Sequence, residues 1–212
     1  MESSNSAAKL KVVGVGGAGG NAINDMMQSD IISDVEFIAI NTDRQDLERS
    51  LTQTRVLLGE GTGAGADPEK GKKAAKESEE AVREVLKGTD MLFITAGMGG
   101  GTGTGAAPIV AEVARGMGIL TVAVVTKPFD FEGPLKKNNA EIGIENLRKH
   151  VDTLIAIPNE KLFELPNISI TLMNAFKEAN GVLRVGIKGI SDLITKQGFV
   201  NLDFADVKAI MQ

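Results

Sequence analysis

The sequence predicts an α/β domain with a doubly wound, mostly parallel sheet that ends in a long central helix. Short apolar, β-branched runs recur along the chain and alternate with helix-like stretches. Several runs are apolar nearly throughout, such as residues 122–125, which is typical of parallel strands that are buried on both faces. The expected strands cover residues 10–15, 35–40, 55–58, 91–95, 119–126 and 154–157.

The segments between these strands predict helices. Residues 69–87 carry small and branched apolar residues between charges and predict one outer-layer helix. A second helix is expected over residues 133–149, with Pro134 tolerated in its first turn. Residues 170–195 place apolar side chains at steps of three and four, interrupted by Asn180, and predict a helix long enough to cross the domain.

The 212 residues therefore divide into four expected segments. A flexible tail covers residues 1–9, where no periodic apolar face is present. One large domain covers residues 10–169, and the long helix follows over residues 170–196. Residues 197–212 predict a loop and the start of a further helix.

Composition excludes several classes of function. The chain has no cysteine and a single histidine, His150, which excludes disulfides, thiolate zinc sites, cysteine nucleophiles and a histidine-rich metal site. A reducing, cytoplasmic compartment is the expected location. The net charge of −5 disfavours a nucleic-acid partner, because phosphate-backbone binding needs a clustered basic surface. No apolar run approaches the roughly 18 to 20 residues of a membrane span, so membrane insertion is not expected.

Glycine is enriched: 25 of the 212 residues are glycine, about 12%, against an average usage of roughly 7%. Most of these glycines fall in three clusters, and each cluster follows an expected strand. Loops at the carboxyl ends of strands form the ligand crevice of a doubly wound sheet, and glycine lets backbone amides approach an anion closely. The clusters are Gly14, Gly16, Gly17, Gly19 and Gly20; Gly59, Gly61, Gly63 and Gly65; and Gly97, Gly99, Gly100, Gly101, Gly103 and Gly105.

The first cluster alone leaves two interpretations open: its glycines serve only tight turns, or they form a dinucleotide-binding loop. Residues 14–19 contain the pattern GxGxxG between a strand and a helix, and Asp43 follows the second strand as a candidate ribose-binding acid. An NAD(P)-binding protein is therefore an alternative. The chain has no GxxxxGK[ST] pattern, which excludes the P-loop proteins.

The third cluster, residues 97–105, favours a different ligand. A single pyrophosphate needs only the first loop, whereas a second glycine-rich loop suits a triphosphate that is held from two sides. Thr102 and Thr104 add hydroxyl groups, and the helix expected to follow presents its positive end to phosphate oxygens.

The GGTGTG run at residues 100–105 resembles the hallmark loop of the tubulin/FtsZ GTPases, and the resemblance extends over nearly all of residues 10–211. Several motifs in the right order are more specific than any one alone. The others are GGAGGN at 16–21, NTD at 41–43, GAGA at 63–66, TKPF at 126–129, FEG at 131–133 and NLDFADV at 201–207.

The resemblance implies a Rossmann-like GTP-binding domain that holds GTP or GDP, with Mg²⁺ bound through phosphate and water oxygens and no metal ligand of its own. It implies that Glu132 contacts the ribose, that Phe176 packs on the guanine ring and that Asn180 reads the base. From the residues alone, the alternatives are that Glu132 is a solvated loop acid, that Phe176 is a core residue and that Asn180 is a satisfied core amide. The implied binding residues are Gly17, Ala18, Gly19, Gly20, Asn21, Asn41, Asp43, Gly101, Thr102, Gly103, Thr104, Glu132, Lys136, Phe176 and Asn180.

Hydrolysis needs an attacking water, for which the candidates are Asn201, Asp203 and Asp206. A helix from Asn180 to Lys196 would advance about 24 Å, so these residues are expected to lie far from the nucleotide of their own chain. A head-to-tail neighbour could bring them to the phosphate, and such a contact propagates into a filament.

As a whole, the resemblance implies a GTPase of the cytoplasm that polymerises for bacterial cell division at mid-cell, where division-ring proteins bind regions absent from this chain. Lys136 stands where the family usually has an arginine, which removes the planar guanidinium fork. The family also continues with a second α/β domain, so we expect this chain to be the nucleotide-binding half. A nucleotide-binding module without turnover is the non-enzymatic alternative.

Overall fold

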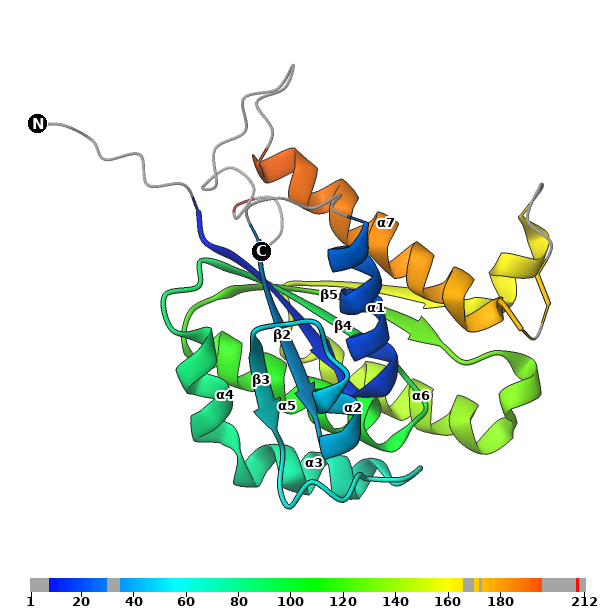
Figure 1. Cartoon of the computed structure of the whole chain (residues 1–212), viewed down its shortest axis with the longest axis horizontal. Coiled ribbons are helices and arrows are strands. Elements are labelled where there is room, and N and C mark those ends of the chain that lie inside the picture. Colours follow the sequence, from blue (N-terminus) through cyan, green and yellow to red (C-terminus); the bar gives the residue numbers. More distant parts are fainter. Residues whose placement is uncertain (1–7, 30–34, 166–169, 172, 196–208, 210–212) are drawn as a thin grey trace, which may run out of the picture.

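A computed structural model describes residues 8–29, 35–165, 170–171, 173–195 and 209 of the chain. Its centre is a six-stranded sheet in the order β3-β2-β1-β4-β5-β6, and every neighbouring pair is parallel (Figure 1). The six expected strands are confirmed. They are β1 (Leu10–Val15), β2 (Val35–Asn41), β3 (Thr54–Leu57), β4 (Met91–Gly97), β5 (Leu120–Lys127) and β6 (Thr153–Pro158).

Helices cover both faces of this sheet (Figure 1). The α-helices are α1 (Gly16–Gln28), α2 (Arg44–Glu48), α3 (Pro68–Glu77), α4 (Glu79–Leu86), α5 (Gly101–Gly116), α6 (Pro134–Arg148) and α7 (Ala175–Thr195). Two short 3₁₀ helices, η1 (Asp130–Glu132) and η2 (Asn159–Glu164), follow β5 and β6.

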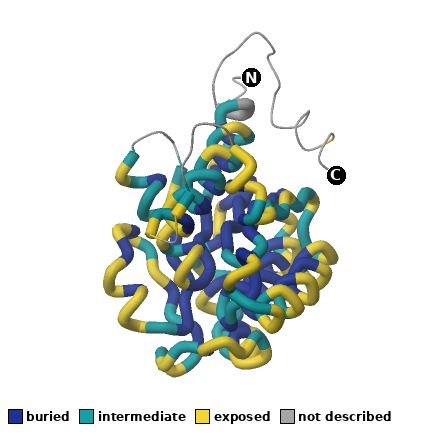
Figure 2. The backbone as a smooth tube through the Cα atoms, turned by 90° about the vertical axis from the view of Figure 1, so that its right-hand side faces the viewer, coloured by how far each residue is buried: buried dark blue, intermediate teal, exposed yellow. Residues whose placement is uncertain are grey.

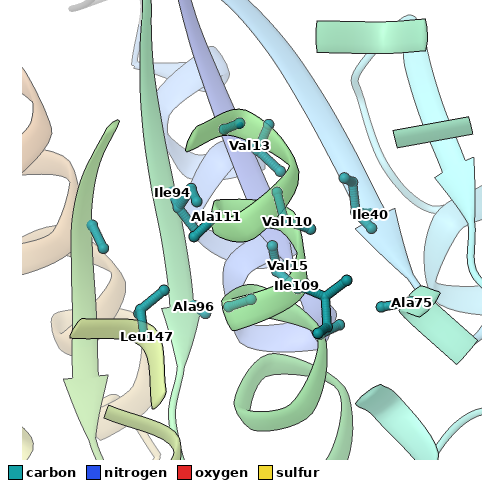
Figure 3. Packing of buried hydrophobic residues seen from close by; sticks show 14 of the residues in the cluster. Val13, Val15, Ile40, Ala75, Ile94, Ala96, Ile109, Val110, Ala111 and Leu147 are labelled. Atoms are coloured by element: carbon teal, nitrogen blue, oxygen red, sulfur yellow. The ribbon is translucent and has the colours of Figure 1, made fainter. Parts of the chain in front are cut away.

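Two buried clusters hold the layers together, one on each face of the sheet. On one face, Val13, Ile40 and Ile94 of the strands pack with Val110 of α5 and Leu147 of α6 (Figure 3). Because the strands are apolar on both faces, the opposite side also becomes core. There the cluster contains Val12, Phe93, Val122, Ile23 and Met26, together with Leu183 and Ile187 of α7. Figure 2 shows this buried interior beneath a largely exposed helical surface.

The topology places a crevice at the carboxyl ends of β1 and β4. These strands are neighbours in the sheet, but the chain leaves them toward opposite faces, because α1 packs with α7 on one face and α5 packs with α3 on the other. The strand order reverses between β1 and β4, and ligands of doubly wound sheets bind at such a switch point.

Two expected helices differ from the structure. The segment 69–87 is not one helix, because it breaks at Ser78, which has φ −109° and ψ 15°. The Ser78 hydroxyl accepts a hydrogen bond of 3.0 Å from the Gly59 backbone N–H, which fixes the break. The long helix begins at Ala175 instead of residue 170, after a turn in which Asn174 Oδ1 accepts from the backbone N–H of Thr171 at 2.7 Å.

Glycines let backbones meet at two places that shape the crevice. A Cβ at Gly19 of α1 would lie 2.5 Å from the Thr95 carbonyl oxygen of β4. A Cβ at Gly105 of α5 would lie 2.0 Å from the Pro68 carbonyl oxygen of α3. Both distances are far below van der Waals contact, so the spacing of these layers requires residues without side chains.

We therefore expect Gly105→Ala to lower the free energy of unfolding by about 1–3 kcal/mol, the range for overpacking, despite the better helix propensity of alanine. Gly116→Ala in the same helix is the matched control, because a Cβ there meets nothing within 4 Å. Urea unfolding monitored by circular dichroism compares the two variants. Equal stability of the two variants would contradict the close-approach argument.

Candidate functional site

The crevice contains a cavity of about 410 Å³ at the carboxyl ends of the strands. Its walls come from the loops after β1, β2, β4 and β5, from η1 and η2, and from the first turns of α7. The lining residues named by the sequence prediction are Gly17, Ala18, Asn41, Asp43, Gly101, Thr102, Gly103, Glu132, Lys136, Phe176 and Asn180.

Two helix N-termini meet at one end of this cavity. A Cβ at Gly16, whose φ is +73°, would lie 3.0 Å from the backbone nitrogen of Gly103, so the first turns of α1 and α5 touch. Neither helix has a side-chain cap or an acidic residue in its first turn. In α3, by contrast, the Asp67 side chain caps the helix and Glu69 lies in the first turn. The positive ends of α1 and α5 therefore face the cavity without a cap or an acid from their own first turns, which favours an anion. The Asp46 carboxylate of α2 lies beside Gly17, where a Cβ would be 3.2 Å from its Oδ2.

Hydroxyl groups hold the second glycine loop in place. The Thr102 and Thr42 hydroxyl oxygens lie 2.6 Å apart, which links the start of α5 to the loop after β2. The Thr104 hydroxyl accepts a hydrogen bond of 2.7 Å from the Gly99 backbone N–H and is buried. Thr104 is not among the residues that line the cavity, so it braces the loop from behind.

Three other predicted residues also lie off the main cavity. Gly19 is buried where α1 packs on β4. Gly20 and Asn21 line a smaller hollow of about 150 Å³. That hollow shares Gly17 and Asn41, among others, with the main cavity, so the two are adjacent.

The polar side chains after β2 are already engaged with one another. The Asp43 carboxylate caps α2, accepting from the backbone N–H of Gln45 at 2.9 Å and of Asp46 at 3.4 Å. Asn41 donates its side-chain amide to the Asp46 carboxylate at 3.3 Å. Asp46 lines the cavity and was not predicted from the sequence.

Glu132 is a fixed acceptor on the wall of the cavity. One of its carboxylate oxygens accepts from the Phe129 backbone N–H at 2.9 Å, and the other accepts from Lys136 Nζ at 3.0 Å. Only 12% of the Glu132 side chain is exposed, against 42% for Lys136. The pair thus presents a held carboxylate with a more exposed cation beside it.

The opposite end of the cavity combines an aromatic face with amides. Phe176 and Asn180 lie one turn apart on α7 and both line the cavity. The Phe176 ring is edge-on to Phe129, with ring centroids 5.7 Å apart, and remains about half exposed.

A further amide, Asn159 at the start of η2, was missed by the sequence prediction. It is 4% exposed, lines the cavity, and its Oδ1 has no hydrogen-bond partner in the described part of the chain. An unpartnered buried acceptor is costly, so Oδ1 is available to accept a hydrogen bond from a ligand donor. Its position two residues after the expected strand 154–157 was the available signal.

The predicted catalytic residues Asn201, Asp203 and Asp206 lie outside the described residues. Across the residues that are described, no group of three or more histidine, cysteine or acidic side chains could hold a metal ion. The helices traced there also include none with the length and apolar character to cross a bilayer.

Comparison with known proteins places this geometry in a family. The chain is 56% identical over 214 aligned residues to the cell division protein FtsZ of Coxiella burnetii, covering 99% of this chain and 55% of that protein. It therefore spans about half of the relative's length.

Solved structures give the same result. The chain matches a structure described as an empty FtsZ dimer of M. jannaschii with a TM-score of 0.92 and 50% identity, covering 98% of this chain and 61% of that one. A GTPγS-bound protofilament structure of CetZ2 from Haloferax volcanii shares the fold, with a TM-score of 0.78 and 24% identity, covering 94% of this chain and 61% of that one. Residues 9–167 match the Tubulin/FtsZ family, GTPase domain. The chain belongs to the tubulin/FtsZ family.

Proposed function

We propose that this chain binds a guanine nucleotide, GTP or GDP, in the cavity between the β1–α1 and β4–α5 loops. The observation that carries the proposal is the meeting of two uncapped helix N-termini at one end of a single cavity. Two sets of free backbone N–H groups suit a chain of phosphates better than one pyrophosphate.

The remaining walls support one orientation of the nucleotide. With the phosphates at the residues around Gly17 and Gly101, the ribose hydroxyls face Glu132 and the base faces Phe176. Glu132 accepts hydrogen bonds from the sugar, and Lys136 adds positive charge on that side. This proposal includes Asn41 and Asp43 on the cavity wall, with Gly20 and Asn21 in the adjoining hollow.

Two amides support guanine as the base. The ring N–H and the amino group of guanine are adjacent donors, and O6 is an acceptor. Asn159 Oδ1 supplies a free buried acceptor, and Asn180 lies on the same cavity wall. The NAD(P) alternative fits less well, because the Asp43 carboxylate already caps α2 and because the second glycine loop would have no phosphate to hold.

A melting experiment separates these ligands. At a concentration of 100 times its Kd, a ligand adds about 2.7 kcal/mol to the free energy of unfolding. For a domain of this size that corresponds to a rise in Tm of roughly 5–10 °C. We expect GDP and GTP to give this rise, and ATP and NAD to give little at the same concentration. A rise with NAD and none with guanine nucleotides would contradict the proposal.

The amide assignment predicts selective losses of affinity. Asn180→Leu and Asn159→Leu should each weaken GDP binding by about 10- to 100-fold, since each leaves a base hydrogen bond unmade at a cost of about 1–3 kcal/mol. Binding of ADP, which is weak from the start, should change little. Asn146→Ala, on the exposed side of α6, is the control. Calorimetric titration measures all four proteins, and unchanged GDP affinity in both leucine variants would remove the amides from the base site.

We further propose that the whole protein hydrolyses GTP and assembles head to tail, with Asn201, Asp203 and Asp206 of one copy acting on the nucleotide of the next. From Asn180 to the end of α7 at Thr195 the helix advances about 22 Å, so the chain leaves its own cavity before residue 196. Mg²⁺ would be held through phosphate and water oxygens and would neutralise phosphate charge. The dimeric relative supports self-association.

In this proposal the protein acts in bacterial cell division, in the cytoplasm at mid-cell, as the similarity to a cell division protein supports. Division-ring proteins would bind parts of the whole protein that lie beyond the segment matched here. The non-enzymatic alternative, binding without turnover, applies to this chain by itself.

If Asp206 acts on the nucleotide of the neighbouring copy, its loss should reduce GTP hydrolysis without reducing nucleotide binding. In a preparation that hydrolyses GTP, Asp206→Ala should lower kcat by about 100-fold or more, the usual range for loss of a group that activates water. Its GDP affinity should stay within about twofold of the parent, because the residue touches only the neighbour's nucleotide. Phosphate release and equilibrium titration measure the two quantities. A parallel loss of GDP affinity would place Asp206 in its own cavity.

A further inference from the structure

We propose a second binding site, a groove over α5 between α3 and α6, that takes an acidic amphipathic helix of a partner protein. The groove encloses about 440 Å³, a volume similar to that of the nucleotide cavity. The proposed function does not use it, and it lies on the sheet face opposite to α1 and α7.

Glycine contacts explain why the groove exists. At Gly105 the backbone of α5 meets α3, where a Cβ would lie 2.0 Å from the Pro68 carbonyl oxygen. At Gly143 the backbone of α6 meets α5, where a Cβ would lie 2.4 Å from Thr104 Cγ2. The outer helices α3 and α6 therefore both approach α5 closely beside these two glycines. The side chains that follow along each helix border a groove whose floor includes Pro108 and Ile109 of α5.

The groove is basic, whereas the chain as a whole carries a net negative charge. Lys72 and Lys76 lie one turn apart on the α3 wall, and within the described part of the chain neither forms an ion pair. Lys149 and His150 lie at the far end of the α6 wall. Three lysines face two acids, Glu69 and Glu112, in a chain whose net charge is −5. Charge complementarity therefore selects an acidic partner and gives the contact its specificity.

An exposed apolar residue beside these charges suits an amphipathic helix as the partner. Ile142 borders the groove on α6 with 55% of its surface exposed, opposite the lysines of α3. From Thr104 to Glu112 the floor helix advances about 12 Å, so a partner helix of a little more than two turns spans the groove. Its apolar face would cover Ile142, and glutamates on its flanks would reach the lysines, which is the helix-in-groove mode of recognition.

A synthetic probe tests the site on the intact 212-residue chain. The probe is a fluorescent peptide of about 12 residues with leucines at helical spacing and glutamates on both flanks, and its twin has lysines in place of the glutamates. We expect the glutamate peptide to bind in a saturable way and the lysine peptide not to bind. The double variant Lys72→Glu/Lys76→Glu should weaken the glutamate peptide about tenfold, and Ile142→Ser should also weaken it.

A control variant on the same helix makes the test specific. Lys70 and Lys73 line a different hollow, between α3 and the loop after β3, so Lys70→Glu/Lys73→Glu changes the net charge equally and should leave the affinity within about twofold. Circular dichroism checks that every variant is folded.

Three outcomes would overturn the proposal. They are no saturable binding of the glutamate peptide, equal binding of both peptides, and equal losses in the two double variants. If the chain instead self-associates in a way that Lys72→Glu/Lys76→Glu abolishes while no peptide binds, the groove serves a second copy and the partner-helix proposal is wrong.

Discussion

The structure depends on the contact between two glycine-rich loops at the carboxyl ends of β1 and β4. Side chains would crowd this contact, since a Cβ at Gly16 would lie 3.0 Å from the Gly103 backbone nitrogen and a Cβ at Gly19 would lie 2.5 Å from the Thr95 carbonyl oxygen of β4. Their absence lets the N-termini of α1 and α5 converge on one cavity. Neither helix has a side-chain cap or an acidic residue in its own first turn, so the arrangement favours an anion.

The rest of the cavity is positioned by elements that pack on this centre. The α7 helix brings its aromatic and amide residues to the far wall because Leu183 and Ile187 pack into the core and because Arg184 pairs with Asp25 of α1 at 2.9 Å. The carboxylate of Glu132 is held by η1 after β5. The proposed phosphate, sugar and base sites therefore come from four separate strand ends and one helix. A rigid parallel sheet keeps these segments in register.

Much of this could be predicted from local patterns. Buried parallel strands are apolar on both faces, so they stand out in the sequence, and glycines that follow strands mark the crevice. The break at Ser78 could not be predicted, because the residues on both sides favour a helix and the bond that fixes the break comes from distant Gly59.

In the candidate site, too, features set by local sequence could be predicted, whereas features set by contacts between distant segments could not. Glycines that approach a ligand and glycines that pack helices have the same sequence pattern, so the sequence alone does not show that Gly19 packs α1 against β4. Thr104 braces a loop through a bond to Gly99 that the sequence could not reveal. Asn159 was missed because its importance arises from burial without a partner, which only the three-dimensional structure contains.

We propose that both glycine loops hold the phosphates of one nucleotide. Amide NMR spectra recorded during a titration with GDP test this arrangement directly. We expect the amide signals of Gly17 and Ala18 and those of Gly101 to Gly103 to shift together, with one common midpoint. Shifts confined to the first loop, or two distinct midpoints, would contradict it.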